Sequence, residues 1–324
     1  MTARHLISLD DLTDDDLHWI TARGASFSAG LIPQERPLDS AVVGVYFRKT
    51  STRTRTAFSA GAQRLGGQIV SFGPDDLQLN TGETSEDTGE VFSRMLDVLV
   101  ARTSGDPAEL RGWAGQDRMA VVNAMSADEH PTQALADLTT LLRQFGRIEG
   151  LRVLYVGEGN NTAAALALAL SRFPGTVLEL RTPPGYGLAP EVRERVAAAA
   201  ARTGARVTEL HHMDGQQGGF DAVYTSRWQT TGTSKPDPDW REVFRPFTVT
   251  AGLWEHSPDA VFMHDLPAHR GEEVEPEVLD GPRSIAFDQA ANKMYSAMAV
   301  LEWCRRDAAD DDTVTGTAGK AAAR

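Results

Sequence analysis

A cationic, hydroxyl-rich segment stands near the N-terminus of a chain that is otherwise acidic. Residues 47–58 read FRKTSTRTRTAF and hold four basic and five hydroxyl side chains. Hydroxyl groups donate hydrogen bonds to phosphate oxygens, and an arginine grips two oxygens with its planar guanidinium. At the start of a helix, unpaired backbone N–H groups add to this attraction. The segment therefore predicts a phosphate site, although a capped helix with solvent-facing arginines explains these residues about as well.

Three further polar side chains stand where predicted strands end or predicted helices begin. Arg102 closes the apolar run VLVAR, and His130 and Gln133 lie in DEHPTQALADL at the entrance of a predicted helix. Because the carboxyl ends of parallel strands meet along one edge of a sheet, these side chains are expected to converge on the ligand of the 47–58 segment. A lone histidine at a helix start is more often a cap or a surface residue, but here it has companions.

Two other patterns are weak signals for a cofactor or a metal. The turn VGEGNN follows a predicted strand like a dinucleotide-binding loop, but Thr162 stands where a third glycine is expected. His211 and His212 with Asp214 offer metal-binding atoms, yet surface histidines after a strand explain them better. The single cysteine, Cys304, excludes an intramolecular disulfide and is interpreted as a packing residue. We therefore expect neither a metal nor a cofactor.

The elements that must position these side chains alternate between strand and helix. β-Branched runs such as AVVGVYF and DVLVART predict buried strands, and PTQALADLTTLLRQFG predicts a long apolar helix. Near Gly150 the strand–helix order begins again with LRVLYVGEGNN. This order predicts an α/β fold of two doubly wound parallel-sheet domains with a cleft between them, joined by N- and C-terminal helices.

The same pattern divides the chain into domains. Residues 1–146 are expected to form the first domain, completed by a C-terminal helix over 292–307, and residues 147–291 the second. The N-terminal segment SLDDLTDDDLHWITARGASF is predicted to be one amphipathic helix. Residues 308–324 have no apolar periodicity and are predicted to be a disordered tail.

The composition argues against two classes of partner. The 324 residues carry a formal net charge of −13, which argues against non-specific nucleic-acid binding. No apolar run approaches the roughly 18 residues that a membrane helix needs. The N-terminal residues also lack the apolar core of a signal peptide. We expect a cytoplasmic protein with neither a nucleic-acid nor a membrane partner.

Beyond these patterns, the chain resembles the aspartate/ornithine carbamoyltransferase family, and its ornithine branch most closely, over about residues 5–306. The resemblance rests on the order and spacing of FRKTSTRTRTAF, LQLNTGETSEDT, VLVART, DEHPTQALADL, VGEGNN, HDLPAHRGEEV and FDQAANKMY. It implies a phosphate-binding first domain, a second domain for an amino-acid acceptor, and a homotrimer with active sites shared between subunits. It also implies direct transfer of a carbamoyl group from carbamoyl phosphate to an amine, with no metal.

The resemblance implies a set of residues around carbamoyl phosphate, namely Ser51, Thr52, Arg53, Thr54, Gln78, Arg102, His130, Gln133, Leu266 and Lys293. The four residues 51–54 would bind the phosphate, while Arg102 and His130, with Thr54, would polarise the carbonyl oxygen. Gln133 and the backbone of Leu266 would hold the carbamoyl NH2, and Gln78 would reach into the neighbouring subunit's site. His264 and His269 flank a proline turn and are interpreted as part of the site wall.

The match departs from the family mainly on the acceptor side, where the implied residues are Asn161, Ser226, Arg227, Thr230, Thr231 and Asp265. Ser226 stands where the family has an aspartate that pairs with the α-ammonium of ornithine, and Thr230 and Thr231 replace a serine and a methionine. The lost carboxylate would leave a partly buried ammonium unpaired, at a cost of about 3–5 kcal/mol. Asp265 replaces a cysteine and could hold a second ammonium or accept the attacking amine's proton. Lys293 replaces an arginine and keeps its charge but not its fork.

These substitutions predict a working carbamoyltransferase with a changed acceptor, for example a short diamino acid such as 2,3-diaminopropionate. Arg53, Arg102, His130 and Asp265 form the expected catalytic set, and Arg227 either meets the acceptor's carboxylate or faces solvent. Three alternatives stay open. They are an ornithine carbamoyltransferase that makes citrulline, a non-catalytic relative that binds carbamoyl phosphate, and, with least support, a nicotinamide oxidoreductase.

Overall fold

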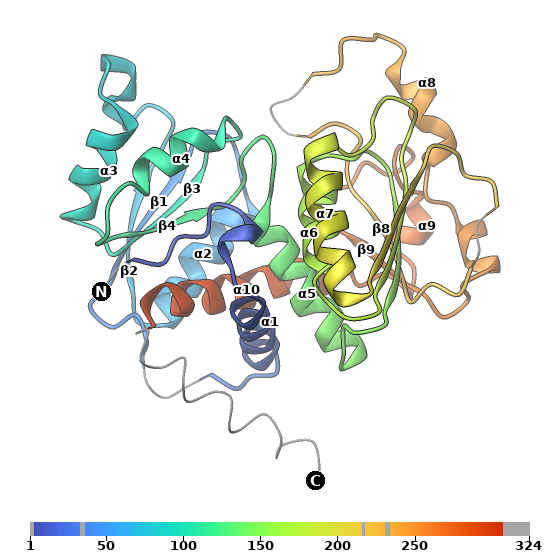
Figure 1. Cartoon of the computed structure of the whole chain (residues 1–324), viewed down its shortest axis with the longest axis horizontal. Coiled ribbons are helices and arrows are strands. Elements are labelled where there is room, and N and C mark those ends of the chain that lie inside the picture. The colour runs from blue at the N-terminus through green and yellow to red at the C-terminus, as the bar shows by residue number, and fades with distance from the viewer. Residues whose placement is uncertain (1–2, 33–35, 216–217, 231–233, 307–324) are drawn as a thin grey trace.

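The computed structural model describes residues 3–32, 36–215, 218–230 and 234–306. Two parallel β-sheets lie side by side, each covered by helices, and three longer helices pack together beside them (Figure 1). The predicted tail 308–324 and the last residue of the helix predicted over 292–307 lie outside the described residues.

The first sheet holds the N-terminal half of the strands in the order β2-β1-β3-β4, and all its pairs are parallel. The strands are β1 (Val42–Phe47), β2 (Gln68–Phe72), β3 (Val98–Arg102) and β4 (Ala120–Asn123). Strands β3 and β4 are buried throughout, which explains their continuous apolar sequences. The connecting helices are α2 (Arg53–Arg64), α3 (Ser85–Ser93) and α4 (Pro107–Trp113), with the 3-10 turn η2 (Gln78–Thr81) before α3.

The second sheet has the order β7-β6-β5-β8-β9 and is also parallel throughout. Its strands are β5 (Arg152–Val156), β6 (Val177–Arg181), β7 (Arg206–Leu210), β8 (Ala222–Thr225) and β9 (Val261–His264). Its helices are α6 (Asn161–Leu170), α7 (Pro190–Thr203), α8 (Trp240–Phe244) and α9 (Pro276–Leu279), with short 3-10 turns at Arg245–Phe247 and Ala251–Glu255. The strand order changes direction at β5, where an open α/β sheet binds its ligands.

Helices α1 (Asp14–Ser28), α5 (Pro131–Phe145) and α10 (Ala286–Arg305) form the layer that joins the two halves (Figure 1). A Cβ atom at Gly24 of α1 would lie 2.7 Å from the Thr139 Oγ1 on α5, so only glycine permits this close approach. Helix α5 starts with Pro131 at its first turn and ends at Gly146, whose φ of 70° is the left-handed conformation that glycine adopts without strain. Both ends of the helix are therefore fixed by its own sequence.

The predicted fold class is confirmed, including the return of the C-terminal helix to the N-terminal ones. The N-terminal segment differs from the prediction of one helix, because it contains a 3-10 turn, η1 (Leu9–Asp11), followed by α1. Ser8 and Thr13 each accept from a backbone N–H two or three residues ahead, so each starts a separate element. The domain boundary at residues 146 and 147 stays a prediction. None of the described helices is long and apolar enough to span a membrane.

Candidate active site

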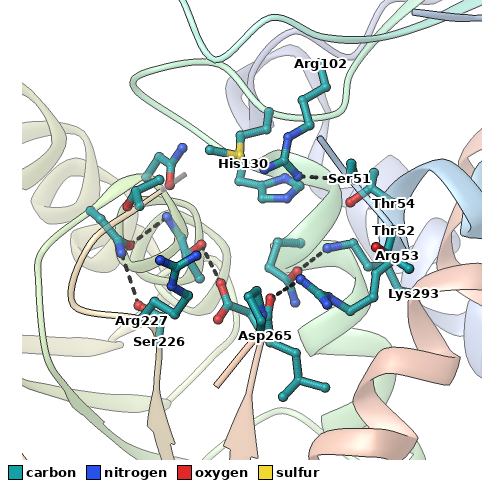
Figure 2. A pocket seen from close by; sticks show the side chains of 18 of the residues that line it. Ser51, Thr52, Arg53, Thr54, Arg102, His130, Ser226, Arg227, Asp265 and Lys293 are labelled. Carbon is teal, nitrogen blue, oxygen red and sulfur yellow. Dashed lines mark hydrogen bonds between the residues drawn. The ribbon is translucent and has the colours of Figure 1, made fainter. Parts of the chain in front are cut away.

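The carboxyl ends of strands from both sheets surround a cavity of about 310 Å³ (Figure 2). Arg102 at the end of β3 and residues that follow β1 and β4 line it from the first half. Residues that follow β5, β8 and β9 line it from the second. Helix α10 adds Lys293. Because each sheet ends at this cavity, side chains that are far apart in the sequence meet in one place.

The donor side of the cavity is built on the start of α2. Arg53 is the first residue of that helix, and its Nη2 donates to the carbonyl oxygen of Leu266 at 2.6 Å. Thr52, the N-cap residue, leaves its hydroxyl out of any side-chain cap among the described residues. The hydroxyl and the free N–H groups of the first helical turn therefore remain available to an anion.

Burial lowers the pKa of basic groups on the donor side. Burial, and next to it the charge of Arg53, lowers the pKa of Arg102 to about 10. Burial also holds the pKa of His130 well below its ordinary value, and the charges of Lys293, Arg102 and Arg53 act in the same direction. The imidazole is therefore neutral at neutral pH and offers one N–H as a donor. Such a cluster is suited to a doubly charged anion.

A chain of buried polar groups extends from Lys293 behind the cavity. The Lys293 ammonium donates to Gln133 Oε1, and Gln133 Nε2 donates to Asp137 Oδ1 at 2.8 Å. Asp137 also accepts from Gln289 Nε2 at 2.7 Å and from the Tyr224 hydroxyl at 3.0 Å. Burial raises the pKa of Asp137 to about 7 and lowers the pKa of Lys293 to about 7. This chain joins α5, α10 and β8 directly beneath the site.

The acceptor side presents mainly hydroxyl and amide groups. The hydroxyl oxygen of Ser226 lies 2.7 Å from the Tyr155 hydroxyl and accepts from Asn160 Nδ2 at 3.1 Å. Asn161 Nδ2 donates to the carbonyl of Ser126 at 2.8 Å, while its Oδ1 is buried without a hydrogen-bond partner among the described residues. Because Asn161 lines the cavity, a ligand ammonium bound there could satisfy this oxygen.

Asp265 stands between the two sides of the cavity. Its Oδ2 accepts from the Thr162 hydroxyl at 3.0 Å, and its charge raises the pKa of Arg53 against the lowering caused by burial. Figure 2 shows Arg53 and Lys293 on one side of Asp265, with Ser226 and Arg227 on the other. The Arg227 Nε is buried and has no hydrogen-bond partner among the described residues, so the side chain belongs to the cavity wall. Asp265 thus offers a carboxylate to both sides of the cavity.

Most of the residues predicted for the site line this cavity. The lining residues are Ser51, Thr52, Arg53, Thr54, Arg102, His130, Gln133, Asn161, Ser226, Arg227, Thr230, Asp265, Leu266 and Lys293. Gln78 is exposed on η2 and, among the described lining residues, is missing from its own chain's cavity. Thr231 lies outside the described residues.

Two histidines expected in the site wall are not among the described residues that line the cavity. His264 is fully buried behind the cavity, where its Nδ1 accepts from the N–H of Leu266 at 2.8 Å. Its Nε2 lies 3.2 Å from the carboxylate of Glu273, which also accepts from the N–H of His269. His269 is exposed and, among the described lining residues, it is missing from the cavity. The expectation for both was therefore wrong, and His264 supports the Leu266 turn instead.

One group of described residues has the spacing of a metal site. Ligand atoms of His269, Glu272 and Glu273 lie within 4.8 Å of one another. Glu273 already accepts from the backbone of His269 and faces His264, so these contacts explain its position without a metal. His211, one of the two histidines considered for a metal, lies beside Thr182, whose hydroxyl is 3.0 Å from the His211 Nδ1.

Sequence reasoning missed several residues that line the cavity: Thr50, Met125, Asn160, Thr162, Gln229 and Pro267. Asn160 was detectable, because an asparagine at a strand-to-helix turn is a strong N-cap. Its Oδ1 accepts from the N–H groups of Thr162 and Ala163. Thr162, at the start of α6, and Met125, in the loop after β4, carry no such signal, because no local pattern shows which way these side chains point.

Comparison with known proteins agrees with this arrangement. Residues 4–143 match the family description "Aspartate/ornithine carbamoyltransferase, carbamoyl-P binding domain", and residues 149–304 match its "Asp/Orn binding domain". An ornithine carbamoyltransferase of Thermococcus kodakarensis is 38% identical, with 93% of this chain and 96% of that protein covered. One of Symbiobacterium thermophilum is also 38% identical, with 93% and 97% covered.

Solved structures show the same similarity in three dimensions. The ornithine carbamoyltransferase of Pyrococcus furiosus superposes with a TM-score of 0.86 at 36% identity, covering 93% of this chain and 96% of that one. The enzyme of Gloeobacter violaceus superposes with a TM-score of 0.83 at 34% identity, covering 94% and 99%. Both domains of the family therefore match this chain, and the relatives align with it over nearly its whole length. The chain belongs to the aspartate/ornithine carbamoyltransferase family and is a carbamoyltransferase that uses carbamoyl phosphate.

Proposed function

We propose that the enzyme transfers the carbamoyl group to the side-chain amine of a diamino acid, giving a ureido product and phosphate. The single observation that carries this proposal is the cavity itself, which joins buried cations of the first half to amide, hydroxyl and carboxylate groups of the second. Ornithine is the first candidate acceptor, because the relatives that cover the whole chain are named for it. The product would then be citrulline.

The donor would lie against the start of α2. Ser51, Thr52 and Arg53 would bind its phosphate through hydroxyl groups, the guanidinium and helix N–H groups. Arg102 and neutral His130 would donate to the carbonyl oxygen, with the hydroxyl of Thr54. Gln133 and the carbonyl of Leu266 would hold the carbamoyl NH2. The Leu266 oxygen already accepts from Arg53, and its second lone pair remains for the substrate.

Catalysis would come from positioning and electrostatics. The neutral amine of the acceptor attacks the carbonyl carbon, the C–O bond to phosphate breaks, and phosphate leaves with the bonding electrons. The donors around the carbonyl oxygen stabilise the charge that develops on it in the transition state. Holding both substrates in one cavity replaces a bimolecular encounter by a local one. The attacking amine's proton would pass to the departing phosphate or to Asp265.

A second candidate is an acceptor shorter than ornithine, such as 2,3-diaminopropionate. Ser226 offers no charge to an ammonium, and its hydroxyl is already engaged with Tyr155 and Asn160. The carboxylate of this cavity belongs instead to Asp265, close to the donor side. An acceptor whose two amines lie close together would place both near Asp265, and its carboxylate would face Arg227. These contacts support the shorter acceptor, whereas the names of the relatives support ornithine.

Steady-state kinetics on a panel of diamino acids decides between the two candidates. Phosphate release from carbamoyl phosphate is measured with ornithine, 2,4-diaminobutyrate and 2,3-diaminopropionate. If the acceptor is ornithine, its kcat/KM exceeds the others by at least tenfold, and the shorter acceptor is wrong. If the acceptor is shorter, ornithine falls at least tenfold below it. In that case the double variant Ser226→Asp, Asp265→Cys should narrow the gap.

Several features of the whole molecule remain proposals. We propose a homotrimer in which Gln78 completes the neighbouring site, with residues 1–146 as the donor domain and 147–291 as the acceptor domain. Exposed apolar side chains at Val70 on β2, Val91 on α3 and Met95 just after α3 support a subunit contact at this edge. Figure 1 shows α3 at the edge of the first sheet farthest from the second.

A further inference from the structure

Lys293 is a primary amine in the cavity where the carbamoyl donor is expected to bind. Its side chain is 5% exposed and lines the cavity together with Arg53, Arg102 and His130. The ammonium donates to the Oε1 of Gln133, the residue proposed above to hold the carbamoyl NH2. The Lys293 Nζ therefore stands beside the place of the transferable group.

The resemblance to the family implies an arginine at this position. A guanidinium keeps its proton at any ordinary pH and is a poor nucleophile, whereas an amine becomes a nucleophile when it loses its proton. The chain has four lysines, at 49, 235, 293 and 320, and only Lys293 lines this cavity among those the structure describes. The change from arginine to lysine thus introduces a reactive type of side chain.

The surroundings of Lys293 favour the neutral amine. In the described part of the chain its hydrogen-bond partner is the uncharged Gln133 and it has no ion pair with a carboxylate, whereas Lys235 is paired with Glu158. Burial lowers the pKa of Lys293 to about 7. The nearby charges of Asp265 and Asp137 oppose this shift, and those of Arg102 and Arg53 support it. A substantial fraction of the side chains therefore carries a free electron pair at neutral pH.

We propose that Lys293 is a site of self-carbamoylation, modified by carbamoyl phosphate bound in the same cavity when no acceptor is present. This rests on the proposed binding of the donor at Arg53. The neutral Nζ attacks the carbonyl carbon and forms a C–N bond. The C–O bond to phosphate breaks, phosphate takes its electron pair, and one Nζ proton passes to that phosphate. The lysine becomes a neutral ureido side chain.

The modified side chain would no longer serve the donor. It has lost its positive charge and carries a planar group into the space beside Gln133. Binding of the next carbamoyl phosphate weakens, and activity falls with each modified site. An acceptor consumes the bound donor before Lys293 reacts. Acceptor shortage would therefore switch off the enzyme covalently.

Peptide mass spectrometry tests the proposal directly on the full chain. Purified protein is incubated with carbamoyl phosphate alone, and samples are taken for activity and for the carbamoyl content of each lysine. We expect modification of Lys293 well ahead of Lys49, Lys235 and Lys320, in proportion to lost activity, and suppression of it by the preferred acceptor. Lysines modified at equal rates, or full inactivation with Lys293 intact, would overturn the proposal.

Carbamoyl phosphate also releases cyanate, which carbamoylates amines without a binding site. Parallel incubations with cyanate alone, and with carbamoyl phosphate plus excess inorganic phosphate, separate the two routes. Reaction from the bound donor is blocked by inorganic phosphate and by Arg53→Ala, while exposed Lys49 continues to react. If cyanate alone modifies Lys293 as fast as carbamoyl phosphate does, and phosphate does not slow it, the site-bound route is wrong.

Lys293→Arg is the matched variant, because it keeps the cation and removes the nucleophile. The activity of this variant should stay constant during incubation with the donor, whether it starts above or below that of the wild type. The activity of the wild type should decline over the same time. A parallel decline of both proteins would count against Lys293 as the cause. Wild-type enzyme that turns over an acceptor, but whose Lys293 stays unmodified during incubation with carbamoyl phosphate alone, would overturn this inference and leave the proposed function standing. Absent turnover with every acceptor would instead contradict the proposed function.

Discussion

At the scale of single residues, the donor side of the cavity is a cluster of desolvated cations with Asp265 as the carboxylate beside them. Burial lowers the pKa of Arg53 and of Arg102. The positive charge of Arg53 lowers the pKa of Arg102 further, and the charge of Asp265 opposes both shifts. A bound phosphate dianion would remove this repulsion and supply the missing acceptors. The free enzyme is thus less favourable locally than its complex with the donor.

Arg53→Ala should lower kcat/KM for carbamoyl phosphate by about 100-fold, which corresponds to about 3 kcal/mol. The variant loses the charge nearest the helix start and the hydrogen bond to Leu266. Arg55→Ala is the matched control, because Arg55 lies on the same helix but stacks on Phe47, with 5.2 Å between the guanidinium carbon and the ring centre. Wild-type phosphate release by Arg53→Ala would show that the donor binds elsewhere.

At the scale of elements, the buried network around Asp137 holds three elements together beneath the cavity. Donors from α5, α10 and β8 meet at one carboxylate, which is fully buried. Such a hub fixes Gln133 and Lys293 from behind, since both belong to the same chain of hydrogen bonds. The donor site therefore depends on how these elements pack.

Asp137→Ala should reduce the free energy of unfolding by about 3 kcal/mol, because the side chains of Gln133, Gln289 and Tyr224 lose their common acceptor. Asp137→Asn keeps an acceptor oxygen and should lose less. Urea unfolding followed by circular dichroism compares the three proteins. Equal stability of Asp137→Ala and the wild type would mean that the network contributes nothing net.

The same carboxylate predicts a pH dependence. Folding raises the pKa of Asp137 from 3.8 to about 7, so the native state binds more protons than the unfolded chain between these values. The contribution of Asp137 to stability is therefore largest below about pH 4 and declines as the pH rises toward 7. The difference in stability between wild type and Asp137→Asn should follow this decline when unfolding is measured across that range. A difference that is constant with pH contradicts the raised pKa.

Helix α10 also carries Cys304, which is buried against the joining layer. Burial raises the pKa of its thiol to about 12. Native protein should therefore react with a thiol reagent at least an order of magnitude more slowly than unfolded protein at pH 8. Rapid labelling without loss of structure would show that α10 detaches locally from α1 and α5.

At the scale of the whole molecule, the position of Gln78 predicts a site shared between subunits. Gln78 is exposed and, among the described lining residues, absent from its own cavity. Mixing inactive Arg53→Ala subunits with inactive Gln78→Ala subunits should restore part of the activity, because some mixed sites carry neither change. Mixed oligomers that stay inactive, with both parents folded, would argue that each site is formed by one chain.

Much of this molecule was predictable from its sequence, because parallel strands and their turns have strong local patterns. The buried runs of β1 and β3 and the cationic segment after β1 lie where they were expected. His264 was misplaced because the sequence around a proline turn is the same whether a histidine beside it faces a cavity or supports the turn from behind. Thr162 was overlooked because its contact with Asp265 joins the start of α6 to the loop after β9, more than 100 residues away, which no local pattern encodes.

The place of α10 in the first half has a consequence for the order in which the chain matures. Residues 286–305 are made last among the described elements, yet they pack against α1, α2 and α5. The surfaces of α1, α2 and α5 that α10 covers therefore stay exposed until synthesis is nearly finished. The contacts of α10 with these helices are long-range in sequence and form slowly. A fragment of residues 1–146 should bind an apolar dye and be cleaved by protease faster than the same residues in the whole chain. A fragment as resistant as the full-length protein would mean that the first half matures alone, before its last helix arrives.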